Sequence, residues 1–232
     1  MKAGAFTYRY ARAALTVDCA VFAFAEGALH VLLIRRGQAP FEGMWALPGG
    51  FIEMDETVEA AARRELLEET GLEQIHLEEL GTFSRVDRDP RERVISIAFV
   101  ALLRGVPEVM RGSDAADARF FRVEEVPALA FDHEEILRAA RARLRAQLRT
   151  RLSCVELLPR KFPLRDLQTL YESILGAPID KRNFRKRMLA MGMLVPLGER
   201  EEGVTHRAAE LYRFDKKRIE KLEKDGFVLG LG

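Results

Sequence analysis

Hydrophobic and polar residues in the first 151 positions of the chain follow two periods, that of a strand and that of a helix. Residues 14–24 (ALTVDCAVFAF) alternate and residues 29–36 (LHVLLIRR) are almost continuously apolar, so both stretches predict β-strands. Residues 93–103 and 118–126 are rich in β-branched and aromatic side chains, which also favours strands. Residues 133–151 show helical spacing instead. The pattern predicts a mixed α/β domain with helices on the faces of its sheet.

A loop and an acidic helix interrupt this series of strands. Residues 41–51 (FEGMWALPGGF) are rich in glycine and proline, which predicts a shaped loop. The helix that follows ends at Gly71, because glycine is a common residue directly after a helix C-terminus. Residues 50–72 contain seven acidic side chains in 23 positions, so this helix is the first candidate for chemistry.

A second domain is predicted from about residue 153, which divides the chain into residues 1–152 and 153–232. Leucine, tyrosine and isoleucine side chains over residues 164–176 keep to one helix face. Asp180 is a suitable N-cap for a further helix over residues 181–191. Two short strands and a last helix are expected at residues 193–197, 210–214 and 215–226. Helix, turn, helix and two-stranded wing is the layout of a winged helix-turn-helix.

Charge is near neutral overall, at +1, but it is unevenly distributed. Residues 1–150 hold 20 basic and 24 acidic side chains, whereas the rest of the chain holds 17 and 12. This asymmetry favours an acidic site in the first domain and a polyanionic partner for the second. No stretch approaches the roughly 20 apolar residues needed to cross a bilayer, and the N-terminus has no signal-peptide core. We therefore expect a cytoplasmic protein with no membrane partner.

The acidic helix places Glu65, Glu68 and Glu69 at positions i, i+3 and i+4, which share one face. Neighbouring carboxylates repel one another unless a cation lies among them. Hard oxygen ligands of this kind suit Mg²⁺ or Mn²⁺. The alternative is an acidic solvated face, which many surface helices have.

The wider pattern around these glutamates resembles the signature of the Nudix hydrolases. The preceding WALPGG also resembles the segment that leads into that signature. The resemblance implies a Nudix α/β/α sandwich with a mixed sheet, which cleaves a nucleoside diphosphate linked to another group. The match covers nine fixed positions over 23 residues: Gly50, Glu56, Arg64, Glu65, Leu66, Glu68, Glu69, Gly71 and Leu72.

The resemblance also implies roles for these residues. Three glutamates would hold Mg²⁺ or Mn²⁺, together with a backbone carbonyl near Gly49 or Gly50, and Arg64 would orient a glutamate. The metal would neutralise the diphosphate and lower the pKa of the water that attacks phosphorus. The general base stays open, because it varies across the superfamily, and a glutamate after residue 81 is among the candidates. The implied catalytic residues are Glu65, Glu68, Glu69 and Arg64, and the structural ones are Gly50, Glu56, Leu66 and Gly71.

Residues 80–99 (LGTFSRVDRDPRERVISIAF) resemble the ADP-ribose pyrophosphatase branch and the regulators related to it. Four arginines here offer cations to phosphates, and an aromatic ring could pack against a base or a ribose. The alternative is a charged surface loop before a strand. The predicted substrate-binding residues are Phe83, Arg85, Arg88, Arg91 and Arg93.

The second helix of the winged unit is basic on one side. Phe184, Met188 and Met191 form an apolar stripe at i, i+4 and i+7, which leaves the cations facing away from it. A helix docked by such a stripe suits the phosphates of a DNA major groove. A solvated basic face is the alternative. The predicted DNA-binding residues are Lys181, Arg182, Asn183, Arg185 and Lys186, with Arg207 in the wing turn.

Residues 155–216 resemble the C-terminal domain of the Nudix-related transcriptional regulators of NAD metabolism, most specifically in LRDLQTLYESILG, DKRNFRKRML and LYRFD. Members of that family repress NAD-biosynthesis or pentose-catabolism operons as dimers, and sense ADP-ribose or a related sugar nucleotide. Two features depart from the usual pattern. The wing reads Arg207-Ala208-Ala209 where Arg-Pro-Ala is usual, which leaves the wing geometry open, and the Nudix signature is complete where several such regulators have damaged ones.

These resemblances favour a nucleotide-sensing transcriptional regulator. Its Nudix domain is expected to bind ADP-ribose or a related nucleoside diphosphate sugar and to retain hydrolase competence with Mg²⁺. The winged helix is expected to bind double-stranded DNA, with the protein as a homodimer. The alternative is a metal-dependent ADP-ribose pyrophosphatase that uses its C-terminal domain for dimerisation.

Overall fold

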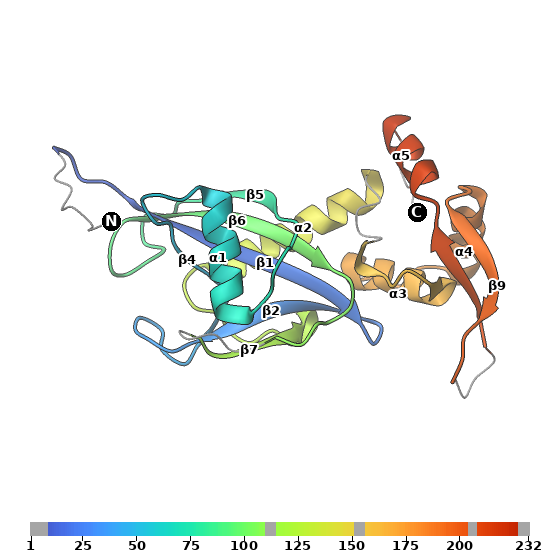
Figure 1. The fold of residues 1–232 in the computed structure, drawn as a ribbon, viewed down its shortest axis with the longest axis horizontal. Helices are drawn as coiled ribbons and strands as arrows, with labels where there is room; N and C mark the ends of the chain where they lie inside the picture. Colours follow the sequence, from blue (N-terminus) through green and yellow to red (C-terminus); the bar gives the residue numbers. More distant parts are fainter. Residues whose placement is uncertain (1–8, 110–114, 151–155, 204–207, 227–232) are drawn as a thin grey trace.

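The computed structural model describes residues 9–109, 115–150, 156–203 and 208–226 (Figure 1). The first domain is built around one seven-stranded mixed sheet. Its long central strands pair in parallel along their whole length, from Ala14↔Val94 to Ala23↔Leu103, and the other pairings are antiparallel. The strands are β1 (Ala14–Ala25), β2 (Ala28–Arg36), β3 (Trp45–Ala46), β4 (Gly49–Phe51), β5 (Glu78–Phe83), β6 (Val94–Leu103) and β7 (Ala115–Arg122).

The sheet divides into a fork between β1 and β2. The two strands pair only near the hairpin that joins them, from Ala25↔Ala28 to Phe22↔Val31. Beyond that point β1 pairs with β4 and β2 pairs with β3, while β7 pairs with β2 over most of its length, from His30 to Arg36. The side chains near the open ends of β1 and β2 therefore face a gap between two halves of one sheet.

Two helices, α1 (Val58–Thr70) and α2 (His133–Thr150), cover the sheet on opposite faces. The alternation along β1 explains this arrangement, because successive side chains of a strand point to opposite faces. Val17, Cys19 and Val21 pack in the cluster that includes Leu66 of α1, whereas Ala20, Phe22 and Phe24 pack in the cluster that includes α2. The result is the predicted α/β/α sandwich.

The second domain has a helix-turn-helix and a small three-stranded sheet. Helix α3 (Leu164–Leu175) ends at Gly176 in the left-handed conformation, at φ 72°, and Asp180 caps α4 (Lys181–Ala190) by accepting from the Asn183 N–H at 2.8 Å. Both caps match the sequence prediction. The remaining elements are β8 (Phe162–Pro163), β9 (Leu194–Arg200), β10 (Glu210–Phe214) and α5 (Lys216–Lys224).

Helix α3 is the part of the second domain that contacts the end of the first one, at β2 and α2 (Figure 1). Arg145 of α2 donates from Nε to the Ile174 carbonyl at 2.9 Å, and Arg104 donates to the Leu158 carbonyl at 2.8 Å. The buried cores of the domains are continuous, since Leu144 of α2 and Leu170 of α3 belong to one cluster. Helix α2 is thus shared by both domains.

Most of the predicted elements are confirmed, with four differences. Residues 41–51, predicted as a loop, contain the short strands β3 and β4, because their backbone pairs with β2 and β1. The strand expected at residues 118–126 ends at Arg122 and gives way to a 3₁₀ turn, Val123–Glu125. Strand β5 was not predicted, and the wing has a third strand, β8, against β10. The predicted domain boundary at residues 152 and 153 lies outside the described residues. None of the described helices is long and apolar enough to cross a membrane.

Candidate functional site

A cavity of about 440 Å³ lies in the fork between β1 and β2. Its lining comes from β1, β2, β4, α1, the segment between β5 and β6, and the segment that leads into α2. A volume of this size falls within the range of small-molecule and cofactor sites. Three walls with different chemistry enclose it, one acidic, one cationic and aromatic, and one made of buried ion pairs.

Helix α1 supplies the acidic wall. Thr57 caps its N-terminus by accepting from the Ala60 N–H at 3.2 Å, and Gly71 ends it in the left-handed conformation. Between these caps Glu65, Glu68 and Glu69 all line the cavity, as their spacing predicts. Glu69 is 8% exposed, and its Oε2 accepts from the Gly49 N–H at 2.9 Å.

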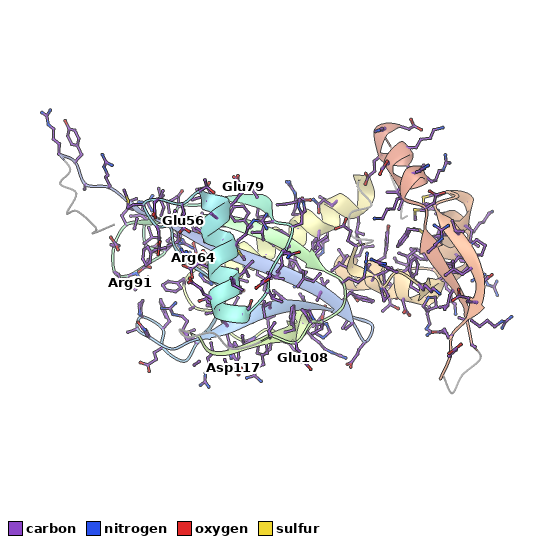
Figure 2. The ribbon with its side chains drawn as sticks, in the orientation of Figure 1. Glu56, Arg64, Glu79, Arg91, Glu108 and Asp117 are labelled. Carbon is purple, nitrogen blue, oxygen red and sulfur yellow. The ribbon has the colours of Figure 1, made fainter. Side chains whose placement is uncertain are left out.

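Arg64 ties the acidic wall to the loop in front of it. Its guanidinium donates to both carboxylate oxygens of Glu56, at 2.6 and 3.1 Å, and to the Phe51 carbonyl at 3.0 Å. A second branch reaches Glu65 at 2.8 Å and Glu68 at 3.2 Å. Glu56 also accepts from the Glu53 N–H at 2.8 Å, and the hydrogen bond from Arg64 lowers the pKa of Glu56. This geometry supports the predicted bracing role of Glu56 (Figure 2).

Two glycines allow the loop to approach both β1 and the acidic wall. Gly49 has φ 156°, and a Cβ there would collide with the Val17 carbonyl, so no larger residue fits. A Cβ on Gly50 would collide with the carboxylate of Glu65. The Gly-Gly pair therefore sets the distance between the loop backbone and the glutamates.

The glutamates fit a divalent cation by their chemistry. Two of the three side chains are largely buried, and hard carboxylate oxygens are the ligands that Mg²⁺ and Mn²⁺ prefer. Among the described residues, no three histidine, cysteine, aspartate or glutamate side chains lie close enough together to hold a metal. The local contacts give the reason, because Arg64 lies between Glu65 and Glu68 while Glu69 is turned toward Gly49.

Burial makes the acidic wall sensitive to pH. Desolvation raises the pKa of Glu69 to about 8 and also raises the pKa of Glu65. Below the ordinary value of about 4.5 both folded and unfolded Glu69 are protonated, and its contribution to stability is fully present. As the pH rises toward 8 the unfolded chain ionises more easily than the folded one, so stability is lost.

We therefore expect the thermal midpoint of the metal-free protein to decrease as the pH is raised from about 5 to about 8. The free energy of unfolding should decrease over the same range by an amount on the order of a few kcal/mol. Mg²⁺ should recover most of this loss at pH 8, because a bound cation stabilises the ionised carboxylates. Differential scanning fluorimetry measures both effects. Glu69→Gln should flatten the pH dependence, whereas the exposed Glu59→Gln should leave it unchanged. Equal pH profiles for Glu69→Gln and the wild type would contradict this assignment.

The opposite wall is cationic and aromatic. The guanidinium of Arg36 lies 4.7 Å from the centre of the Phe131 ring, and that of Arg91 lies 5.3 Å from the Phe51 ring. Arg91 forms a two-point ion pair with Asp89, but Arg36 forms no ion pair with any described residue and donates only to backbone carbonyls, such as that of Pro40 at 2.8 Å. Burial and the neighbouring Arg91 lower the pKa of Arg36. This wall thus offers a half-buried cation that has no ion-pair partner among the described residues.

Phe131 is held in a strained backbone conformation at this wall, with φ 53°. A left-handed conformation costs a residue with a Cβ roughly 1–2 kcal/mol. Strain of this kind persists where the surrounding structure enforces it, often at binding sites. Phe41 packs edge-on against the Phe131 ring at 4.8 Å, which supports the ring from outside the cavity.

A buried ion-pair network forms the floor. Arg88 donates to both oxygens of Asp132, at 2.7 and 3.0 Å, and to Asp18 at 3.2 Å. His133 Nδ1 accepts from the Leu47 N–H at 2.9 Å, so the proton of the neutral ring is on Nε2, 3.3 Å from Asp18 Oδ1. Burial lowers the pKa of His133, which keeps the ring neutral. The first residue of α2 therefore anchors the loop that carries the two glycines.

The predicted substrate residues separate into two groups. Arg88 and Arg91 line the cavity, although Arg88 is 5% exposed and engaged by carboxylates. Phe83, Arg85 and Arg93 do not line it. Phe83 is in β5, Arg85 pairs with Asp87 at 2.8 Å, and Arg93 donates to the carbonyls of Ser84, Arg85 and Val94. The cavity residues that the sequence did not single out include Asp18, Arg36, Phe51, Phe131 and His133.

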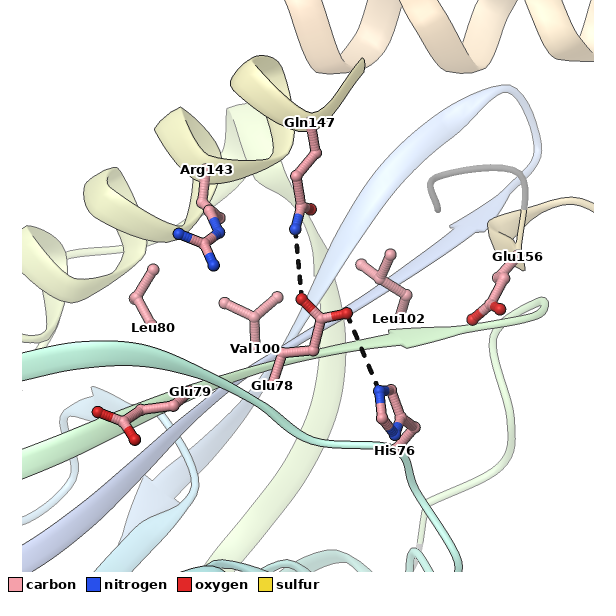
Figure 3. Close-up of a pocket in the computed structure, with 9 residues that line it drawn as sticks. All are labelled: His76, Glu78, Glu79, Leu80, Val100, Leu102, Arg143, Gln147 and Glu156. Carbon is pink, nitrogen blue, oxygen red and sulfur yellow. Dashed lines mark hydrogen bonds and ion pairs between the residues drawn. The ribbon is translucent and has the colours of Figure 1, made fainter. Parts of the chain in front are cut away.

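A second, smaller cavity of about 100 Å³ lies between β5, β6 and α2 (Figure 3). Glu78 accepts from the Gln147 amide at 3.3 Å and lies 3.9 Å from His76 across it. The volume is well below that of ordinary nucleotide sites, and its central carboxylate is already engaged. We therefore place the functional site in the larger cavity.

Helix α4 presents the predicted basic face. Phe184 and Met188 are buried at 1% and 0% exposure, and Met191 packs against the same core. Arg207 lies outside the described residues. The wing closes through reciprocal contacts of Glu201 and Ala209, with Glu201 N donating to the Ala209 carbonyl at 3.0 Å and Ala209 N donating to the Glu201 carboxylate at 3.1 Å. The exposed residues of the α4 face are Lys181, Arg182, Asn183, Arg185 and Lys186.

Comparison with known proteins gives matches for both domains. Residues 13–140 match the model of the NUDIX domain, and residues 154–214 match that of the NrtR DNA-binding winged helix domain. The chain is 36% identical over 204 residues to the ADPR responsive transcriptional repressor NtrR of Acinetobacter baylyi, which covers 86% of this chain and 81% of that protein. It is 49% identical over 119 residues to the ADP-ribose pyrophosphatase of Methanocaldococcus jannaschii, covering 51% and 70%. Shewanella oneidensis NrtR, crystallised with a 27mer DNA, superposes with a TM-score of 0.71 at 30% identity, covering 89% of this chain and 95% of that one.

Proposed function

Because this chain belongs to the Nudix family, and within it to the regulators that join a Nudix domain to an NrtR-type winged helix, we propose that it is an ADP-ribose-responsive transcriptional regulator. The observation that carries the proposal is the cavity, which is lined by three carboxylates of α1, by a cation that has no ion-pair partner among the described residues, and by two phenyl rings. The same chain carries an exposed basic helix in a winged helix domain.

The chemistry of ADP-ribose suits the two walls. Its diphosphate is an anion that would pair with Arg36, and its adenine and ribose rings have faces that would pack on Phe131 and Phe51. The glutamates would hold Mg²⁺ against the diphosphate from the other side. The cavity thus offers a cation for the diphosphate, carboxylates for the metal and two phenyl rings for the rings of such a ligand.

We expect Arg36→Ala to weaken ADP-ribose binding by roughly 10-fold to 150-fold, because a hydrogen bond to a charged group contributes about 1.5–3 kcal/mol. Isothermal titration calorimetry in Mg²⁺-free buffer measures this without consuming the ligand. Arg35→Ala is the matched control, because Arg35 precedes Arg36 on β2 and does not line the cavity. Wild-type affinity in Arg36→Ala would exclude this wall as the anion site.

The intact acidic wall supports hydrolysis of the bound ligand. Glu65, Glu68 and Glu69 would hold the metal, which supplies charge neutralisation at the diphosphate and a more acidic water. Arg64 keeps Glu65 and Glu68 in place through its fixed contacts with Glu56. The strong similarity to an archaeal ADP-ribose pyrophosphatase favours this activity.

The regulator is proposed to act as a homodimer on double-stranded DNA, with α4 in the major groove. Lys181, Arg182, Asn183, Arg185 and Lys186 are its proposed contacts, with Arg207 from the wing. A two-fold dimer would bind two half-sites related by the same symmetry. We propose a cytoplasmic location for this DNA-binding regulator, as expected from the sequence.

Helix α2 is the proposed link between ligand and DNA. It begins at His133, in the floor of the cavity, and its Arg145 donates to the end of α3 in the second domain. Ligand control requires that ADP-ribose bind two arrangements of the domains with different affinity. A helix with one end in each domain is suited to transmit that difference.

We expect Arg145→Ala to reduce the effect of ADP-ribose on DNA affinity at least about fivefold, which is the scale of an ordinary allosteric coupling. ADP-ribose affinity without DNA should change little, because Arg145 is remote from the cavity lining. Fluorescence anisotropy of a labelled duplex, titrated at saturating and zero ADP-ribose, gives the coupling directly. Arg143→Ala is the control, because Arg143 is on the same helix but lines the smaller cavity instead of bonding to α3. Undiminished coupling in Arg145→Ala would remove this contact from the pathway.

A gel-shift titration tests the proposed function as a whole. The purified protein is titrated on DNA from upstream of its own gene, with and without ADP-ribose, in the presence of Mg²⁺, and hydrolysis products are followed in the same samples. Specific binding that ADP-ribose alters supports the regulator. Brisk hydrolysis without specific DNA binding would instead favour a pyrophosphatase that uses its winged helix for dimerisation.

A further inference from the structure

The last described helix, α5, carries a row of lysines on one face. Lys217, Lys221 and Lys224 are exposed, and their spacing of i, i+4 and i+7 places them on one side of a helix with 3.6 residues per turn. Within the part of the chain that the structure describes, none of their amino groups is engaged in an ion pair or a side-chain hydrogen bond. We call this surface the lysine face. The residues matched to the winged helix domain end at 214, so the lysine face lies beyond them.

Contacts of α5 fix which way it is turned. Ile219 is buried and Leu222 packs against the same core, so the side of the helix that carries them faces inward. Arg218 donates from Nε to the Met191 carbonyl at 3.1 Å, which attaches α5 to the C-terminal end of α4. The Asp215 N–H adds a bond to the Met193 carbonyl at 2.8 Å. Figure 1 shows α5 and α4 at the same end of the molecule.

The helical order of the side chains then places the lysine face next to α4. Lys221 follows Arg218 by three residues and so lies beside it, on the edge of α5 that adjoins α4. Lys217 and Lys224 continue the row outward. Glu220 and Glu223 lie beyond the row, on the edge away from Arg218, where they are separated from α4. Lys221 therefore lies on the side of α5 that adjoins the C-terminal end of α4, while the acidic edge of α5 turns away from it.

We propose that the lysine face is a second DNA-contacting surface, which binds backbone phosphates beside the site of α4. The proposal rests on the proposed DNA-binding function. A duplex carries one negative charge per roughly 1.7 Å of axis, and α5, with nine residues at about 1.5 Å each, spans several of them. Lysine suits this role, because a compact mobile ammonium contacts phosphates without reading bases. The face would add affinity and leave sequence choice to α4.

Charge reversal at adjacent positions tests the proposal in the full chain. Lys217→Glu and Lys221→Glu change the lysine face, whereas Lys216→Glu makes the same charge change on the edge that carries Glu220 and Glu223. Anisotropy titrations on the upstream duplex and on a scrambled duplex of equal length, at several salt concentrations, give affinity and salt slope. Thermal midpoints confirm that each variant is folded.

We expect Lys217→Glu and Lys221→Glu each to lower affinity for both duplexes on the order of fivefold or more at 0.15 M salt, and to reduce the salt slope by about 0.9. Lys216→Glu should stay within about twofold of the wild type. Unchanged affinity and slope for the first two variants, or an equal loss in Lys216→Glu, would overturn the proposal. DNA binding that depends on Arg182 and Arg185 but not on Lys217 or Lys221 overturns this inference alone. No DNA binding by the wild type overturns it together with the proposed function.

Discussion

The double substitution Glu68→Gln with Glu69→Gln is expected to abolish ADP-ribose hydrolysis while leaving the fold intact. Glutamine keeps the size of glutamate and its Oε1 still accepts from the Gly49 N–H, so the loop keeps its anchor. It cannot supply the negative charge that holds a divalent cation against a diphosphate. Loss of metal assistance worth several kcal/mol lowers the rate by roughly 10³-fold or more.

Release of AMP from ADP-ribose, followed by chromatography at a fixed Mg²⁺ concentration, measures this effect. Glu59→Gln with Glu73→Gln removes two exposed carboxylates from α1 and the segment after it, outside the cavity, and should keep wild-type activity. Turnover in the Glu68→Gln, Glu69→Gln variant at the wild-type rate would remove these glutamates from the metal site. The metal-free variant should also be more stable than the wild type at pH 8, because it lacks the buried carboxylate whose pKa is raised.

The same variant separates sensing from turnover. If ADP-ribose still changes DNA affinity when hydrolysis is abolished, the ligand acts by binding, and hydrolysis only limits how long the signal lasts. If the response disappears together with metal binding, the metal is part of ligand recognition. The two outcomes can be distinguished in this variant because the acidic wall and Arg36 line the same cavity, and only the acidic wall is changed.

Local sequence signals predicted the elements whose ends are set by neighbouring residues. Gly71 and Gly176 take the left-handed conformation that ends a helix, and Asp180 caps the next one. Such caps depend on a few adjacent residues, so a sequence reveals them. Strand β5 escaped prediction because its residues, EELGTF, mix polar and apolar side chains beside a glycine, and pairing with β6 is what fixes it.

The acidic wall could be predicted for the same reason, since one helix carries all three glutamates. Of the cationic wall only Arg91 was predicted, because Arg36 and Phe131 are far apart in sequence and come together only in the folded chain. Phe83 and Arg85 were predicted from the resemblance of residues 80–99, but Phe83 is in β5, Arg85 pairs with Asp87, and neither lines the cavity. Arg88 was nominated as a free cation, yet Asp18 and Asp132 engage it in the folded chain. Ion-pair partners from distant parts of the chain therefore determine which arginine can bind a ligand.

We expect Arg182→Ala with Arg185→Ala to weaken binding to the upstream DNA at least about tenfold and to lower the salt slope by about two. Both arginines are exposed on α4, whose opposite side is fixed by the buried Phe184 and Met188. Each phosphate that an arginine no longer neutralises lowers the salt slope by about 0.9, and a two-point hydrogen bond to a base is worth roughly 1–3 kcal/mol. Alanine is a good helix former, so the helix itself should persist.

Anisotropy on the upstream and scrambled duplexes distinguishes base reading from phosphate binding. A decrease in affinity that is larger on the upstream duplex assigns base reading to the arginines, whereas equal decreases on both assign phosphate binding. Arg122→Ala with Arg138→Ala removes two exposed arginines from the first domain and controls for net charge. If the α4 variant binds the upstream duplex like the wild type, α4 is not the reading helix. A selective decrease for the α4 variant, beside a uniform decrease for variants of the lysine face of α5, would divide DNA recognition between one helix that reads sequence and another that holds the backbone.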